Sequence, residues 1–290
     1  MQRYHLNAWH RSSGTSYMAD IYTVIDSYAD LLARRHPRLY RQFQKRRLDN
    51  HESALAEAVT FSVLQQCGVK PEIADQLNKG GPDFRCTGIR DEQFVVEATS
   101  FEPDKVTKDT SIKNELQPGM SGQCLSLLTR QLEEKAELKR RQFEQLRCPG
   151  ILAIASSHLG SSLVLDAYAA ENALISQPFW VVNEEGMFTD LASSLFLHLE
   201  DDGEITVRKQ CISAVLLVSV AGDRSHVCGA LNPAATHKFK SESLWMVPFV
   251  YLKDWPIEGR RPRCEWTMGS TRSYAVEHKS IRALEPSLGK

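Results

Sequence analysis

Two short stretches decide the fold: Gly80-Gly81-Pro82-Asp83-Phe84 and, further along the chain, Phe94-Val95-Val96-Glu97-Ala98-Thr99. The first leads into a strand-like segment over residues 83–87, and the second lies within another over residues 93–101. The connection between these segments contains Gly88 and Asp91, which are typical of a short turn between paired strands. The sequence therefore predicts a β-hairpin whose turn is centred on Arg90.

The register of this hairpin brings two carboxylates together. With the turn centred on Arg90, Asp83 lies opposite Glu97, with β-carbons about 4.5–5.5 Å apart. Like charges at that distance repel, and a divalent cation between them is the simplest remedy, because Mg²⁺ binds carboxylate oxygens. Alternatively, Asp83 caps a turn and Glu97 points to water. The apolar neighbours of Glu97 indicate burial instead, and a buried carboxylate requires a partner.

Helical periodicity surrounds the hairpin. Apolar residues recur at three- and four-residue steps in three segments, which predicts three amphipathic helices, over residues 17–32, 52–66 and 123–146. Residues 102–117 are polar and predict a loop, whereas residues 151–155 are apolar and typical of a buried strand. The predicted fold is α/β: one domain over residues 49–290 with a mixed central sheet flanked by helices, preceded by a helical extension at residues 1–48.

Charged residues interrupt the inward stripes of two predicted helices. Glu57 shares its stripe with Ala54, Phe61 and Leu64, so it is a third candidate acid. Lys135 follows Leu128 and Leu132 on the inward stripe of the later helix, and Lys139 lies one turn further on. Each residue alone could reach solvent along its own stem. Together they predict an acidic pocket that contains one cation.

A basic segment without any acidic residue extends over residues 34–47. Such a segment can bind the phosphates of a nucleic acid, and its two aromatic residues could pack or stack. The alternative is a solvated helix face whose charge is offset elsewhere in the fold. The candidate nucleic-acid-binding residues are Arg34, Arg35, Arg38, Arg41, Lys45, Arg46 and Arg47.

The composition excludes several classes of protein. The chain has 290 residues, 42% of them hydrophobic, and 35 Lys plus Arg against 36 Asp plus Glu, which is ordinary for a globular protein and excludes a disordered one. Its seven cysteines show no pair at the spacing of structural zinc sites. The longest strongly apolar stretch, residues 212–221, is about half of what a membrane-spanning helix needs. We therefore expect a cytoplasmic protein that does not enter a membrane.

A helix Glu (Glu57), then Pro82-Asp83, then the strand sequence Glu97-Ala98-Thr99 resembles the pattern of the restriction-endonuclease-like, or PD-(D/E)XK, nuclease superfamily. The resemblance covers residues 52–155. It implies a mixed sheet flanked by helices, and Mg²⁺ or Mn²⁺ bound by Asp83, Glu97 and the carbonyl of Ala98. It also implies hydrolysis of phosphodiester bonds in nucleic acid, DNA in the first instance.

One position departs from that pattern. The superfamily places a lysine two residues after the strand Glu, where this chain has Thr99. Some members supply the lysine from a neighbouring helix, which makes Lys135 the first candidate and Lys139 the second. The expected catalytic set is then Glu57, Asp83, Glu97 and Lys135.

Two other functions stay open at this stage. The first is a binding protein on the same fold whose hydrolytic site has decayed, which the substitution at Thr99 permits. Such a protein would bind nucleic acid or a protein partner without cleavage. The second is an interaction protein whose basic segment contacts an acidic protein partner.

Overall fold

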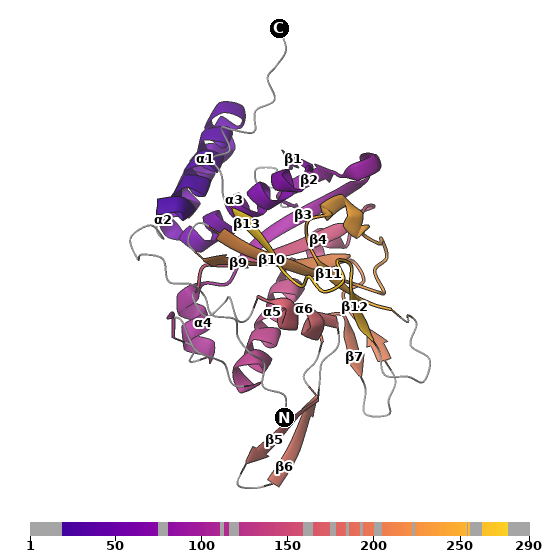
Figure 1. Ribbon diagram of the computed structural model, residues 1–290. Helices are drawn as coiled ribbons and strands as arrows, with labels where there is room; N and C mark the ends of the chain where they lie inside the picture. Colours follow the sequence, from indigo (N-terminus) through magenta and orange to yellow (C-terminus); the bar gives the residue numbers. More distant parts are fainter. Residues whose placement is uncertain are drawn as a thin grey trace.

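The computed structural model describes residues 19–74, 81–110, 113–115, 122–158, 165–174, 178–183, 186–191, 194–199, 205–221, 224–253, 255 and 263–277. These residues form an α/β protein in which three N-terminal helices precede a mixed sheet packed with further helices (Figure 1). The α/β class and the mixed sheet predicted from the sequence are therefore confirmed.

The main sheet has the order β1-β2-β3-β4-β9-β10-β11-β12, and β13 pairs with β10. Its centre is parallel, because β4 runs parallel to both β3 and β9, whereas β1, β2 and β3 pair as an antiparallel meander. The strands of this sheet are β1 (Lys70–Ile73), β2 (Phe84–Thr87), β3 (Gln93–Ser100), β4 (Gly150–Ser156), β9 (Ala214–Ala221), β10 (Arg224–Leu231), β11 (Phe249–Leu252), β12 (Cys264–Trp266) and β13 (Tyr274–Glu277).

Two small hairpins lie outside the main sheet. One consists of β5 (Pro178–Asn183) and β6 (Gly186–Leu191), and the other of β7 (Leu197–Leu199) and β8 (Ile205–Val207). Figure 1 shows the β5–β6 hairpin projecting away from the body of the molecule.

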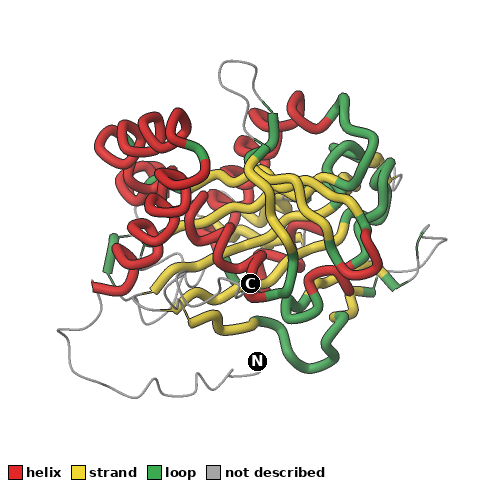
Figure 2. Tube along the Cα trace, turned by 90° about the horizontal axis from the view of Figure 1, so that it is seen from above, coloured by secondary structure: helices red, strands yellow, loops and turns green. Residues whose placement is uncertain are grey.

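Helices cover both faces of the main sheet. The helices are α1 (Ala19–Arg35), α2 (Pro37–Asp49), α3 (His51–Gln66), α4 (Pro103–Thr110), α5 (Gly122–Phe143) and α6 (Ala167–Leu174). Helices α1–α3 pack on one face, with α1 and α2 outside α3, while α5 and α6 pack on the other (Figures 1 and 2). Strand β3 serves both layers through its two-residue period: Val96 lies in the first hydrophobic core and Val95 in the second.

The N-terminal helices share a core with the sheet. Tyr28 of α1 is fully buried, and its ring lies 5.2 Å from that of Phe43 on α2 and 5.1 Å from that of Phe61 on α3, measured between centroids. The ring of Phe61 in turn lies 5.7 Å from that of Phe84 on β2. The boundary predicted between residues 48 and 49 falls in the last turn of α2, and the elements before and after it pack around one aromatic cluster.

The predicted helices and hairpin are found close to their expected bounds, as α1, α3, α5 and the pair β2–β3. The loop predicted over residues 102–117 is wrong in its first part, which forms α4. This helix has few apolar residues, but Pro103 suits a first helical position and Val106 is buried as an anchor. Within the described part of the chain, no helix combines the length and hydropathy needed to cross a membrane.

Candidate active site

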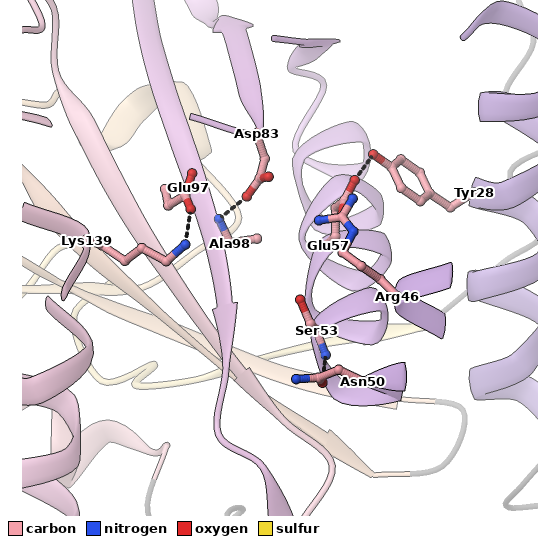
Figure 3. A network of polar contacts seen from close by, with 9 residues as sticks. All are labelled: Tyr28, Arg46, Asn50, Ser53, Glu57, Asp83, Glu97, Ala98 and Lys139. Carbon is pink, nitrogen blue, oxygen red and sulfur yellow. Dashed lines mark hydrogen bonds and ion pairs between the residues drawn. The ribbon is translucent and has the colours of Figure 1, made fainter. Parts of the chain in front are cut away.

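The β2–β3 register confirms the predicted pairing, with Phe84 opposite Val96 and Thr87 opposite Gln93. Asp83 directly precedes β2, and its Oδ2 accepts a hydrogen bond of 2.7 Å from the backbone N–H of Ala98 (Figure 3). The carboxylate thereby replaces the next backbone contact of the ladder and is held at the edge of β3.

Pro82 leaves the carbonyl of Ala98 without a ladder donor. The amides of Val95 and Phe101 donate to β4 or its immediate approach, at Pro149 and Ala155, so odd-numbered residues of β3 direct their backbone groups to that side. The backbone groups of Ala98 therefore point towards β2, where continuing the register beyond Phe84 would place Pro82. Proline has no N–H to donate. The Ala98 carbonyl consequently faces the same edge that the Asp83 carboxylate occupies.

Glu97 is the most buried acid of the site, with 2% of its surface exposed. Its Oε1 lies 2.5 Å from Nζ of Lys139 on α5. Its Oε2 is buried and has no hydrogen bond of normal geometry to any described residue. Burial above all, and then the charge of Asp83, raise the pKa of Glu97 to about 8, although Lys139 and Gln142 act in the opposite direction. Asp83 and Glu97 therefore influence each other electrostatically, as the hairpin register predicts.

The amine beside Glu97 belongs to Lys139, the second of the two lysine candidates. Lys135 lies one turn earlier on α5 and makes no ion pair with a described residue. It lines a separate small pocket, together with Glu102 and Lys105. Helical periodicity places both lysines on one stripe, and only the docking of α5 against β3 selects between them.

Glu57 is also buried, at 5% exposed, but on the side of α3. Its Oε1 accepts a hydrogen bond of 2.8 Å from the hydroxyl of Tyr28, and its Oε2 lies 2.7 Å from the guanidinium of Arg46. Burial and the charge of Glu57 hold the pKa of Tyr28 well above its ordinary value, with a smaller contribution from Asp83. Sequence periodicity identified Tyr28 only as an apolar position, because its partner is far away along the chain.

The structure divides the basic segment into three groups. Arg46 is bound to Glu57, and Arg47 lies 2.6 Å from Asp26 of α1, so both are engaged within the fold. By contrast, one face of α2 presents three exposed cations at three- and four-residue steps, with no ion pair to the residues that the structure describes: Arg38, Arg41 and Lys45. We call these three residues the α2 stripe.

The remaining members of the segment complete this picture. Arg34 and Arg35 are exposed at the end of α1, and Nε of Arg34 donates to the carbonyl of Asp30. Phe43 lies fully in the core. It packs there and is not available to stack on a base.

The site suits a small hard cation with oxygen ligands. The described residues contain no group of three or more His, Cys, Asp or Glu side chains placed to hold a metal, so Glu57 stands apart from the other two acids. The available donors are Asp83, Glu97 with its unused Oε2, and the carbonyl of Ala98. Mg²⁺ takes one or two carboxylates and completes its shell with water and substrate phosphate, so these donors fit it.

Comparisons with known proteins found no relative of this chain. No protein-family model matches the chain, and neither the curated proteins nor the solved structures include one that is similar to it.

Proposed function

We propose that this protein is a metal-dependent nuclease with a restriction-endonuclease-like core, which hydrolyses phosphodiester bonds of nucleic acid. One observation carries the proposal: the Asp83 carboxylate accepts a hydrogen bond from the backbone amide of Ala98, and the neighbouring residue, Glu97, forms an ion pair with Lys139. Two acids and an amine close together at one strand are parts that metal-dependent hydrolysis can use.

Each residue has a separate role in this proposal. Asp83, Glu97 and the Ala98 carbonyl would hold Mg²⁺ or Mn²⁺, which supplies Lewis acidity towards a phosphate oxygen. Lys139 keeps the Glu97 carboxylate oriented and places a positive charge where negative charge develops on the phosphate. Glu57, expected to act on the metal, instead ties α3 to the N-terminal helices through Tyr28 and Arg46.

The α2 stripe is the proposed contact for the polyanion. Its three side chains share one face of a helix, opposite Leu39 and Phe43, which are buried. Contacts of this kind to phosphates give affinity without sequence preference and are weakened by salt. We propose nucleic acid, and DNA in the first instance, as the partner that this surface binds.

Substitution of Asp83 tests the proposed chemistry. Asp83→Asn removes the charge but keeps the shape, and we expect cleavage of DNA or RNA with Mg²⁺ or Mn²⁺ to fall at least about 100-fold. Asp49→Asn is the matched control, because Asp49 is exposed at the end of α2. Circular dichroism would confirm that both variants fold. Equal cleavage by Asp83→Asn and wild type would reject the site.

A decayed nuclease that only binds is the second candidate, and Thr99 favours it. The side chain at the position of the motif lysine carries no charge, and Lys139 is committed to Glu97. This candidate predicts salt-sensitive binding of nucleic acid with no metal-dependent turnover in the wild type. The cleavage assay above separates it from the first candidate.

A further inference from the structure

A small pocket lies next to the proposed active site, one turn along α5 from Lys139. Its volume is about 40 Å³, and it lies between the end of β3, the start of α4 and the middle of α5. The polar and charged residues that line it are Glu102, Lys105, Gln131, Glu134 and Lys135. None of them has a role in the chemistry proposed above.

The charged residues that line this pocket differ in whether they have a hydrogen-bond or ion-pair partner. Glu102 accepts a hydrogen bond of 2.9 Å from Asn50, and Glu134 lies 3.9 Å from the ammonium of Lys105. Lys135, in contrast, makes neither a hydrogen bond nor an ion pair with any residue that the structure describes. It is the one charged side chain lining the pocket for which the described residues provide no such partner.

A half-buried ammonium of this kind carries an energetic cost. Burial lowers the pKa of Lys135, and the neighbouring charges of Lys105 and Lys139 act in the same direction. The charge of Glu102 opposes them without forming an ion pair. An anionic ligand would remove this cost, because charges out of water are stable only when they are paired.

We propose that this pocket binds one phosphate group of the polynucleotide, the neighbour of the phosphate processed beside Glu97. A pocket of about 40 Å³ holds only a few water-sized groups, so it suits phosphate oxygens and not a base. Lys135 and Lys139 are separated by about 6 Å along the helix axis, on the order of the step between consecutive phosphates. The assignment of the ligand to nucleic acid rests on the proposed function.

The salt dependence of binding tests this assignment without requiring cleavage. Binding of a fluorescein-labelled DNA oligonucleotide would be measured by anisotropy in EDTA over a range of salt concentrations. For Lys135→Met we expect weaker binding and a log–log salt slope reduced by about 0.7–0.9, which corresponds to one lost phosphate contact. Lys108→Met is the matched control, because Lys108 is exposed on α4 and does not line the pocket. An unchanged slope in Lys135→Met overturns the inference.

A second measurement separates the pocket from the proposed function. If the wild type binds no nucleic acid, the proposed function fails, and the pocket is then probed by calorimetric titration with inorganic phosphate. Heat of binding in wild type and Lys108→Met that is absent in Lys135→Met supports an anion pocket. No heat in the wild type overturns it.

The stability of the same variant gives an independent readout. A lysine kept for ligand binding costs stability when the ligand is absent, so we expect the melting temperature of Lys135→Met to equal or exceed that of the wild type. A lysine that merely supported the fold would lower it when replaced. A clear fall in melting temperature together with an unchanged salt slope would assign Lys135 a structural role.

Discussion

Glu57 and Glu97 are buried acids, each with a cation beside it, yet they lie on opposite layers of the molecule and differ in one respect. Both oxygens of Glu57 have a partner within 2.8 Å, one from α1 and one from α2. Glu97 has Lys139 on one oxygen, while its second oxygen has no hydrogen bond of normal geometry to a described residue. Oε2 of Glu57 also lacks a hydrogen bond of normal geometry, but it lies in an ion pair with Arg46, whereas the ion pair of Glu97 with Lys139 is on Oε1.

The surroundings of the two acids reinforce this difference. Glu57 lies under two helices that supply a hydroxyl and a guanidinium, and burial together with the charge of Glu57 raises the pKa of Tyr28 well above its ordinary value. Glu97 lies near a strand edge where a proline interrupts pairing. Removing a partner of Glu57 should therefore affect folding, and removing the partner of Glu97 should affect catalysis as well as folding.

The largest expected effect is on the Glu57 side. Arg46→Met leaves a buried carboxylate without its cation, and we expect the free energy of unfolding to fall by about 3 kcal/mol. Urea unfolding would measure the loss. Arg47→Met is the matched control, because its partner Asp26 is largely exposed and a surface pair contributes less than about 1 kcal/mol. Equal losses for the two variants would show that the buried ion pair of Arg46 contributes no more to stability than the exposed ion pair of Arg47.

On the Glu97 side, Lys139→Met should affect the reaction as well as the fold. We expect single-turnover cleavage to fall about 100-fold, since one electrostatic contact to the reacting phosphate is lost. Lys139→Arg keeps a cation on the same stripe and should recover part of the rate. If Lys139→Met were folded and cleaved as fast as the wild type, the amine would have no part in the reaction.

A last prediction sharpens the electrostatic contrast through pH. Because the pKa of Glu97 is raised to about 8 in the folded protein, above the usual value of about 4.3, the folded state binds its proton more tightly than the unfolded state does. The resulting stabilisation is complete below about pH 4 and is lost as the pH rises through 8. Urea unfolding in EDTA should show this decline in the wild type and a flatter profile in Glu97→Gln. Parallel profiles would contradict it.

The sequence predicted the parts of the site that depend on local rules. The turn centred on Arg90 determines the β2–β3 register, because each strand residue has only one partner once the turn is known. The three- and four-residue steps around Glu57 likewise placed it inside the protein. Such inferences need only neighbouring residues and the period of the element.

The parts that failed depend on how distant elements dock. Lys135 and Lys139 occupy the same stripe of α5, and local periodicity does not choose between two positions one turn apart. Arg46 belonged to an unbroken basic segment, and its capture by Glu57 follows only from the packing of α2 on α3. The sequence pattern identified Tyr28 only as an apolar position, whereas in the structure its hydroxyl donates a hydrogen bond to Glu57.

Pro82 has a consequence for how this sheet can change. Any other residue at position 82 would carry a backbone N–H. The hydrogen-bond ladder between β2 and β3 could then extend by one more pair, towards Ala98. Such a lengthened ladder would gain a hydrogen bond while closing the opening through which a ligand arrives. A single proline thus ends the pairing of β2 with β3 early. Selection for stability alone would favour a residue that extends this pairing.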